Sequence, residues 1–296
     1  SKEKFCKMAQ TTLEYFTLAM FRQLTEDLGI KNICLSGGIF SNIKNNMNII
    51  KELNIKNWFI FPHMGDGGLS AGAALFIDNY KNNTKPYKLN SVSLGPEYSK
   101  KEILNTLTKY KTKLNWYEHK DISGYAAGEI AKSKVVYWFN GKMEYGPRAL
   151  GNRSILATPN KKEMKDKINK IIKRRNWFQP FCPAILEEEA RKMFESFDKS
   201  DPFMTMGYQI KESKRDLLEA AQGVDGSCRP QIIQENNCAY SNLLKKLKKN
   251  MGVAAVLNTS FNIHGEPIVM NPEDALQTLL RTKEASMVMG NFIIKL

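Results

Sequence analysis

The first third of the chain contains two segments, 31–53 and 57–79, that share one order of local patterns. Each begins with a short apolar run typical of a strand, continues through a glycine-rich turn and ends in helical spacing. The turns occupy 36–38 and 65–68. Strands that alternate with helices in this way favour an α/β layer, so this repeated unit predicts the fold class.

The two turns present backbone amides at the start of a helix. Such amides attract phosphate, and glycine removes the side chain that would block a close approach. The residues concerned are Ser36, Gly37, Gly38, Gly65 and Gly67. Ordinary turn chemistry explains the same residues equally well. Asp66 lies in the second turn, where its carboxylate is suited either to binding a cation or to capping the next helix.

The spacing over 3–28 predicts an opening helix with one buried stripe. The stripe consists of Phe5, Ala9, Leu13, Phe16, Met20, Leu24 and Leu28. Gly29 follows at the position where a glycine C-cap is expected.

A polar segment at 81–100 contains Pro86 and Pro96 and indicates a domain boundary. A chain of 296 residues is long enough for two domains. Beyond the boundary, helical spacing occurs at 100–110, 121–132, 161–174, 187–196, 240–250 and from Pro272 onward. Strand patterns occur at 114–118, 135–139, 178–186, 203–210, 223–233, 253–262 and 286–294.

The formal net charge is +14, which favours anionic partners. Lysines cluster at 161–173 and 245–249, where the helical spacing indicates solvated helix faces. Phosphorylated small molecules and nucleic acid would both explain the charge. The chain has no aromatic–basic signature of a known nucleic-acid module, which argues against nucleic acid.

The five cysteines show no metal-type spacing, which indicates reduced thiols and a cytoplasmic protein rather than a disulfide framework. No apolar run is long enough to span a bilayer, and no signal peptide is visible. Because the chain opens directly into a helical pattern, we expect it to be a fragment or a processed piece of something longer.

Residues 144–156 read EYGPRALGNRSIL and follow the apolar run at 135–139. Arg148 and Arg153 lie five positions apart in this segment. Glycine lets the backbone approach a ligand, and arginine offers a planar fork of donors that fits phosphate or carboxylate. The segment therefore predicts a strand that leads into an anion-binding loop. The alternative is a surface turn whose arginines pair with acids.

Six motifs occur together and in a fixed order. They are LSGGIFSN at 35–42, GDGGLSAGAAL at 65–75, NGKMEYGPRALGNRSIL at 140–156, KRRNWFQPFCP at 173–183, VDGSCRPQ at 224–231 and LNTSFNIHGEPIV at 257–269. Jointly they resemble the NodU-type O-carbamoyltransferases, and the resemblance covers essentially the whole chain. The first two motifs are shared more widely with the actin/hexokinase-like (ASKHA) nucleotide-binding fold.

The resemblance implies an α/β (α+β) chain with a partial actin-like lobe at about 1–88 and a YrdC-like domain at about 97–296. The YrdC-like domain would join carbamoyl phosphate and ATP into a carbamoyl-adenylate and release pyrophosphate. The actin-like domain would transfer the carbamoyl group to a hydroxyl of a small-molecule or glycan acceptor. This domain would use nucleotide and a divalent metal, iron or magnesium, and its N-terminal half would be missing from this chain.

The resemblance also implies roles for individual residues. The groups expected on the phosphates and the carbamoyl oxygen are Arg148, Arg153, Lys173, Arg175 and Arg229. Lys173 and Arg175 resemble the Lys-x-Arg of YrdC-type domains, although a cationic helix end would also explain them. Ser260 and Asn262 resemble the turn that holds the adenylate. We expect Arg148, Arg153 and Arg229 to share one cationic pocket near Ser260.

Asp66 matches the aspartate metal ligand of the family, whose other ligands are two histidines in the half that this chain lacks. The chain departs from the family at Lys142 and Asn160, where arginine is usual, at Asn176, where glutamate is usual, and at Gln179, where arginine is usual. Arginine and lysine are not equivalent at a bidentate site, so these departures bear on full activity.

Two other functions are compatible with the same residues. One is a threonylcarbamoyl-adenylate synthase that acts in tRNA modification, which would also account for the positive charge. The other is a nucleotide-binding module without catalysis, which the departures would explain. A homodimer is one option for the assembly.

Overall fold

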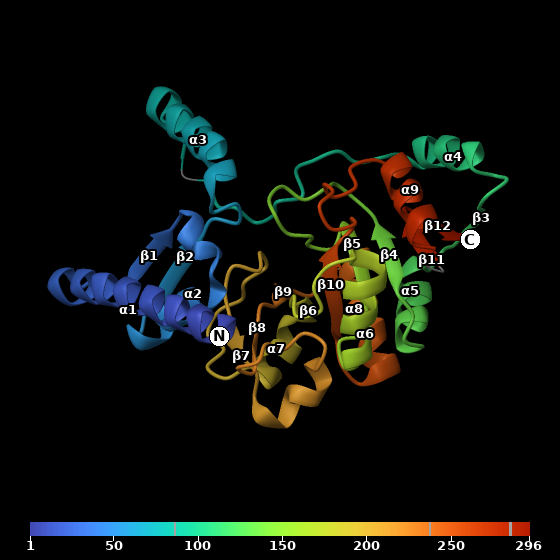
Figure 1. Ribbon diagram of the computed structural model, residues 1–296. Helices are drawn as coiled ribbons and strands as arrows, with labels where there is room; N and C mark the ends of the chain where they lie inside the picture. The colour runs from blue at the N-terminus through green and yellow to red at the C-terminus, as the bar shows by residue number, and fades with distance from the viewer. Residues whose placement is uncertain (86, 237, 284–285) are drawn as a thin grey trace. The chain divides into compact units, whose positions relative to one another are not determined.

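A computed structural model describes residues 1–85, 87–236, 238–283 and 286–296, which divide into two compact units (Figure 1). Unit 1 comprises residues 1–90 together with 205–207, and unit 2 comprises 91–204 and 208–296. Pro86, which the sequence placed in the linker, lies outside the described residues.

Unit 1 contains both predicted strand–turn–helix segments. Its elements are α1 (Lys2–Leu28), β1 (Asn32–Leu35), η1 (Gly38–Ser41), α2 (Ile43–Glu52), β2 (Asn57–Ile60), η2 (Asp66–Gly68) and α3 (Leu69–Asn82). β1 and β2 pair in parallel, with Asn32 opposite Asn57. Parallel pairing brings the two turns to the same edge, and the Gly37 amide donates to the Met64 carbonyl over 2.6 Å.

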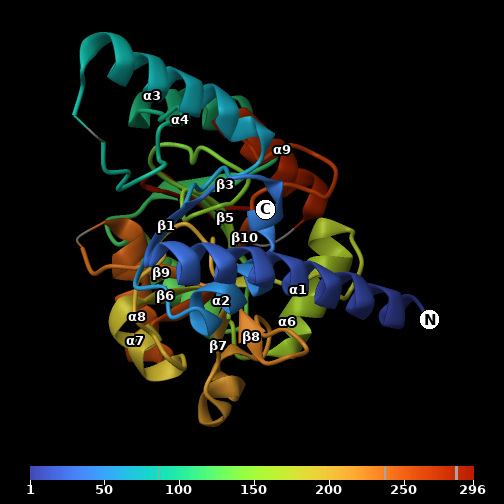
Figure 2. The same cartoon turned by 90° about the vertical axis from the view of Figure 1, so that its left-hand side faces the viewer.

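The opening helix ends at Gly29 in a left-handed conformation, as predicted, but the predicted buried stripe is wrong. Phe16 is 66% exposed and Met20 is 51% exposed. α1 instead turns Thr17 and Phe21 toward α2, which it runs alongside in both views (Figures 1 and 2). A hydrogen bond of 2.5 Å joins the Thr17 hydroxyl to the Asn45 side chain on that face, and every residue of the predicted stripe except Leu13 is exposed.

α3 is exposed along almost its whole length, although its composition is apolar. No residue of this helix is buried. The large exposed side chains are Leu69, Leu75, Phe76, Ile77 and Tyr80. Together with the α1 stripe, they leave unit 1 with more uncovered apolar surface than scattered single residues would give.

Within the described residues, unit 2 contains an eight-stranded sheet of mixed direction in the order β3-β12-β11-β4-β5-β10-β6-β9. The strands are β3 (Asn115–Glu118), β4 (Val136–Phe139), β5 (Arg153–Ala157), β6 (Cys182–Leu186), β9 (Gln231–Ile233), β10 (Ala255–Ser260), β11 (Ser286–Met289) and β12 (Phe292–Lys295). β11 runs parallel to β4 and β6 runs parallel to β9, and the other neighbours are antiparallel. The fold is therefore mixed α/β.

Helices cover both faces of this sheet (Figures 1 and 2). α5 (Ile122–Ala131) and α8 (Ala239–Met251) pack on one face, where Val136 and Trp138 point. α4 (Lys100–Lys109), α6 (Lys162–Lys167) and α9 (Pro272–Thr282) contribute to the core on the other face, where Tyr137 and Phe139 point. Successive residues of β4 thus alternate between two cores, which explains why the strand reads as continuously apolar.

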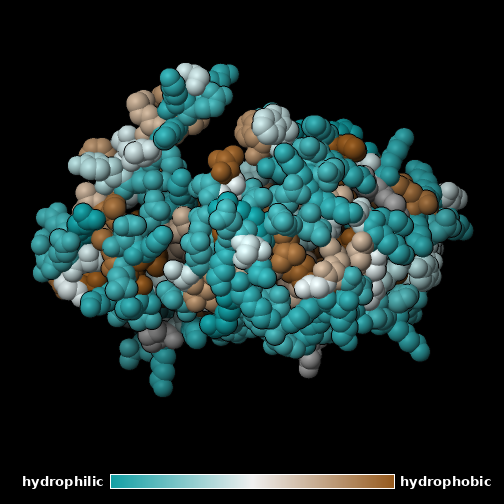
Figure 3. All heavy atoms as spheres, turned by 90° about the horizontal axis from the view of Figure 1, so that it is seen from below, coloured by the Kyte–Doolittle hydropathy of each residue, from teal (hydrophilic) through white to brown (hydrophobic). Residues whose placement is uncertain are grey.

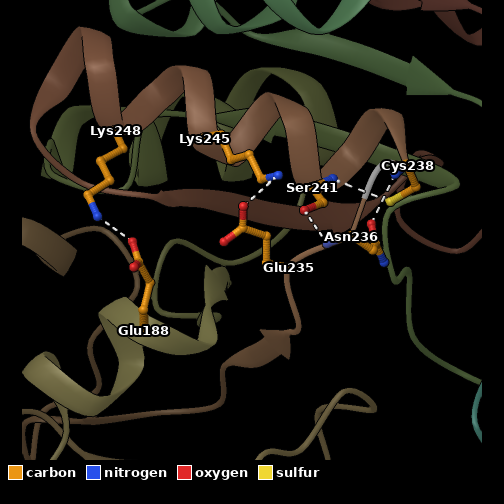
Figure 4. Close-up of polar contacts among 7 residues, drawn as sticks. All are labelled: Glu188, Glu235, Asn236, Cys238, Ser241, Lys245 and Lys248. Carbon is orange, nitrogen blue, oxygen red and sulfur yellow. Dashed lines mark hydrogen bonds and ion pairs between the residues drawn. The ribbon is translucent and has the colours of Figure 1, made fainter.

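Polar contacts fix the ends of α8 (Figure 4). Cys238 caps the start of the helix, since its sulfur accepts from the Ser241 amide at 3.4 Å. Lys245 pairs with Glu235 at 2.7 Å, and Lys248 pairs with Glu188 near the helix end. These contacts join α8 to Glu235 of the preceding segment and to Glu188 of α7 (Glu187–Met193).

Several segments differ from the sequence-based expectation. The strand β5 was not predicted, because its start lies inside the segment interpreted as a loop. The predicted final strand is a hairpin of β11 and β12, which turns at Gly290 with a positive φ of 53°. Only Tyr208–Gln209 of the predicted strand at 203–210 forms a strand, β7, which pairs with β8 (Ser227–Cys228).

The molecular face drawn in Figure 3 is mostly hydrophilic, with apolar atoms in separate patches. Among the described residues, no helix is long and apolar enough to cross a membrane. All five cysteines are free.

Candidate functional site

The topology of unit 2 gathers the predicted site residues at one end of the sheet. β4 and β10 end there, while their antiparallel neighbours β5 and β6 begin there. β9 runs parallel to β6 and begins at the same end. The loop 140–152, the segment 173–181, Arg229 and the turn after Ser260 therefore emerge together.

A buried carboxylate, that of Glu144, organises the loop 140–152. Its Oε1 accepts from the backbone amides of Leu150 at 2.7 Å, Asn152 at 2.7 Å and Arg153 at 3.2 Å. Its Oε2 is buried and has no hydrogen-bond partner among the described residues. Three amides on one charged oxygen fix the loop, because hydrogen bonds to ionised acceptors are the stronger ones.

Side chains of the sheet strands β9 and β10 form hydrogen bonds with the same loop. Asn258 on β10 donates to the Ala149 carbonyl at 3.0 Å, and Gln231 on β9 donates to the Leu150 carbonyl at 2.8 Å. Gly151 has a φ of +101°, and an added Cβ would lie 2.3 Å from the Tyr240 ring, so glycine is required there. These contacts fix the part of the loop that directly follows Arg148.

Arg148 lies at this end of the sheet, where the charges of Arg229 and Cys182 affect its pKa. Burial, and then the positive charge of Arg229, lower the pKa of Arg148 to about 10. The Arg229 Nε lies 3.1 Å from the Cys182 sulfur, to which it donates. Two guanidinium groups that repel one another form a place where an anion would be favoured.

Lys173 is almost fully buried, at 2% exposure. It ends a π-helical turn, η3 (Ile168–Lys173), a rare geometry that often occurs at functional sites. Its Nζ donates to the Ser260 hydroxyl at 2.9 Å and the Asn262 carbonyl at 3.0 Å, and also contacts the Ser260 carbonyl and the Asn262 side-chain oxygen, both at 2.5 Å. Burial, and then the charge of Arg175, lower the pKa of Lys173 to about 7. The four oxygens act in the opposite direction, because they stabilise the ammonium.

Arg175 is held by Asn169 and by an aromatic ring. Its Nε donates to the Asn169 side-chain oxygen at 2.6 Å, and its guanidinium lies 4.7 Å from the centre of the Phe181 ring. Burial lowers the pKa of Arg175. The charge of Arg175 lowers the pKa of Lys173, and the charge of Cys182 acts on the pKa of Arg175 in the raising direction.

Arg153 is placed differently from the other predicted cations. It begins β5, is fully buried, and donates to the carbonyls of Gly141 at 3.0 Å and Pro96 at 3.1 Å. Its guanidinium lies 3.7 Å from the centre of the Phe139 ring. We expected Arg153 to share a pocket with Arg148 and Arg229. In the structure, the guanidinium of Arg153 instead donates to backbone carbonyls that flank the loop.

Among the described residues, no carboxylate lies within ion-pair distance of Arg148, Arg175, Arg229 or Lys173. Uncompensated cations that share the end of a sheet and are partly withdrawn from water carry an electrostatic cost. A bound polyanion would relieve that cost, so this arrangement suits a phosphorylated ligand.

The glycine-rich turns of unit 1 form a separate candidate site. Ser36, Gly37 and Gly38 lie beside the turn of Gly65 and Gly67, since the Gly37 amide bonds to Met64. Asp66 is exposed and is the first residue of η2, whose N-cap is Gly65. No group of three potential metal ligands occurs in the described part of the chain. The carboxylate of Asp66 is therefore not sufficient to define a metal site by itself.

Sequence reasoning missed the residues that position the cations. Glu144 and Asn169 bind backbone and side chains around Arg148 and Arg175, and Asn258 and Gln231 secure the loop. Of these residues, Glu144 was the easiest to predict. It directly precedes the turn that contains Arg148, where a carboxylate can accept from nearby backbone amides. Asn169 was hidden in a lysine-rich helical pattern.

The pKa of Lys173 leads to a pH prediction. Above about pH 7 the ammonium loses its proton, so we expect sulfate, whose charge is constant from pH 6 to 8.5, to bind roughly tenfold more weakly at the upper end. Lys173→Arg should flatten this profile, because arginine stays charged. Isothermal titration at several pH values measures the effect, with Lys170→Arg as an exposed control. A flat wild-type profile would contradict the assignment.

Comparison with known proteins agrees with the sequence resemblance. The family model described as Carbamoyltransferase C-terminus matches residues 127–295, and that described as Carbamoyltransferase N-terminus matches residues 2–75. The chain is 38% identical over 291 residues to nodulation protein NolNO of Sinorhizobium fredii, covering 97% of this chain and 43% of that protein. It is 38% identical over 305 residues to an uncharacterized protein of Methanocaldococcus jannaschii, covering 99% and 49%.

Two solved structures show a more distant likeness. Full-length HypF in the phosphate- and nucleotide-bound form aligns with a TM-score of 0.41 at 15% identity, covering 60% of this chain and 22% of that chain. P. abyssi Sua5 complexed with L-threonine aligns with a TM-score of 0.39 at 15% identity, covering 57% and 46%. Both likenesses are too distant to assign a fold.

The chain spans about half the length of the curated relatives it matches. Within that length, the family match includes every predicted cation of unit 2, from Arg148 to Arg229, and the turn of Ser260 and Asn262. The chain therefore belongs to the carbamoyltransferase family.

Proposed function

We propose that unit 2 makes a carbamoyl-adenylate from carbamoyl phosphate and ATP, for later transfer to a hydroxyl of a small-molecule or glycan acceptor. The observation that carries this proposal is the group of uncompensated cations at one end of the sheet in a chain of the carbamoyltransferase family. Both proposed substrates are strongly anionic, so catalysis would depend mainly on positioning and charge stabilisation.

The atoms of this reaction balance in two steps. Water cleaves carbamoyl phosphate to carbamate and inorganic phosphate. An oxygen of carbamate then attacks the α-phosphorus of ATP and the bond to pyrophosphate breaks, which leaves carbamoyl-adenylate. Arg148, Arg175 and Arg229 are the groups we assign to the negative charge that develops on the phosphates. Lys173 would donate a hydrogen bond to the carbamoyl oxygen or to a phosphate.

Ser260 and Asn262 would have two functions in this scheme. Their oxygens hold the Lys173 ammonium in the structure. When an anion binds to Lys173, some of these oxygens would be released to contact the adenylate. The Ser260 hydroxyl is suited to that exchange, because a hydroxyl donates as well as accepts.

Unit 1 would contribute to transfer as part of an actin-like domain. Its paired glycine-rich turns would approach nucleotide phosphates, and Asp66 would supply one carboxylate to a divalent metal completed by ligands from outside this chain. The uncovered apolar faces of α1 and α3 support the same view, since another half-domain would bury them. The chain spans about half the length of its relatives, which leaves room for such a half-domain.

An exchange experiment tests the proposed activity. The chain is incubated with ATP and labelled pyrophosphate, and the return of label into ATP is measured. Exchange that requires carbamoyl phosphate supports the proposal. Exchange that requires threonine and bicarbonate would assign a threonylcarbamoyl-adenylate synthase instead. ATP binding without any exchange would leave a nucleotide-binding module without catalysis.

A further inference from the structure

Two large aromatic side chains, Trp177 and Phe178, lie exposed in the segment that carries Lys173 and Arg175. Trp177 is 65% exposed and Phe178 is 59% exposed. Their rings meet edge to face with centroids 6.0 Å apart. Trp138, by contrast, is fully buried in unit 2. The pair therefore presents aromatic surface to the solvent beside the cationic segment.

The backbone beneath the pair is fixed, although the side chains are exposed. Asn169, which is fully buried, donates from its side-chain nitrogen to the carbonyls of Trp177 and Gln179, both at 3.0 Å. The Gln179 amide closes a turn on the Asn176 carbonyl at 3.2 Å. A fixed backbone that carries exposed rings is pre-organised, because a ligand would not have to order the loop on binding.

The chemistry next to the pair is cationic. The Arg174 side chain is exposed, and Arg175 is half-buried. Trp177 follows Arg175 by two residues, so their Cα atoms lie within about 7 Å of each other. Asn169 binds the Arg175 Nε through its side-chain oxygen and the Trp177 carbonyl through its side-chain nitrogen. The buried side chain of Asn169 therefore fixes both the guanidinium of Arg175 and the backbone of Trp177.

From this juxtaposition we propose that Trp177 and Phe178 form the stacking platform for the base of the nucleotide whose phosphates meet the cations. A ligand that carries several negative charges and a planar ring matches the platform and its neighbours together. Every nucleobase presents a π-face, and stacking on an aromatic side chain is a general mode of recognition. The inference rests on the proposed function, because it assigns a subsite to the same nucleotide.

Two probes that differ by the nucleoside test the inference. ATP carries a base, and inorganic triphosphate carries the phosphate chain without one. We expect Trp177→Ala to weaken ATP binding roughly 5- to 150-fold and to leave the affinity for triphosphate unchanged. Trp177→Phe should retain most of the ATP affinity. Tyr117→Ala, which removes a half-exposed ring from β3 at the far edge of the sheet, serves as the matched control.

Isothermal titration of each variant with each probe distinguishes the outcomes, with thermal unfolding as a check that the fold persists. Loss of ATP affinity alone would support the base platform. Equal affinities of wild type and Trp177→Ala for ATP would overturn this inference and leave the proposed function standing, as would an equal loss for both probes. Failure of the wild-type chain to bind ATP would overturn both.

Discussion

Replacement of Arg148 by alanine should reduce carbamoyl phosphate-dependent pyrophosphate exchange by about 10²- to 10³-fold, the usual effect of removing one preorganised donor. The side chain makes no hydrogen bond or ion pair within the described residues, and it is repelled by Arg229. Its removal therefore costs the fold little. We expect the midpoint of thermal unfolding to stay close to that of the wild type while the exchange rate falls.

The control for Arg148 is Arg191→Ala on α7 (Glu187–Met193), which removes an exposed guanidinium paired with Glu187. A surface pair of this kind contributes little, so exchange should persist. Arg148→Lys should give an intermediate rate, because lysine keeps the charge and loses the planar fork. Unchanged exchange in Arg148→Ala would refute the role assigned to this residue.

Replacement of Glu144 by alanine should destabilise unit 2 by about 3 kcal/mol, because three backbone amides lose a charged acceptor inside the protein. The loop around Arg148 would then lose its anchor, and exchange should fall as well. Urea unfolding gives the free energy, and the exchange assay gives the activity.

Two variants sharpen the Glu144 prediction. Glu144→Gln keeps one side-chain oxygen as an acceptor and should lose clearly less stability than the alanine variant. Glu163→Ala removes an exposed acid of α6 and should change neither quantity. If the urea midpoint of unfolding were the same for Glu144→Ala and the wild type, the carboxylate would not organise the loop.

The elements with strong local patterns were predictable from the sequence. The capping residue Asn271 with Pro272 starts α9, and the apolar run at 135–139 forms β4. β5 was not predictable in this way, because it begins in a Gly- and Asn-rich segment. The segment forms a strand because it pairs with β4 and β10, which lie away from it in the sequence, and local patterns do not show such pairing.

The candidate site was only partly accessible from the sequence, for a similar reason. Motif resemblance assigned Lys173, Ser260 and Asn262 to binding of the adenylate, and the structure brings these three residues into contact. The same reasoning grouped Arg153 with Arg148, although entry into β5 buries Arg153 against carbonyls. The packed face of α1 contains Thr17, which bonds to Asn45, and Phe21, a pairing that apolar spacing does not reveal.

The activity proposed for unit 2 is the activation of a carbamoyl group by adenylation. The most direct measurement is identification of the product formed from ATP and ¹³C-labelled carbamoyl phosphate by mass spectrometry and ³¹P resonance. We expect a labelled mixed anhydride of carbamic acid and AMP, accompanied by pyrophosphate in equal amount. Formation of ADP with inorganic phosphate, and no label on an adenylate, would contradict it.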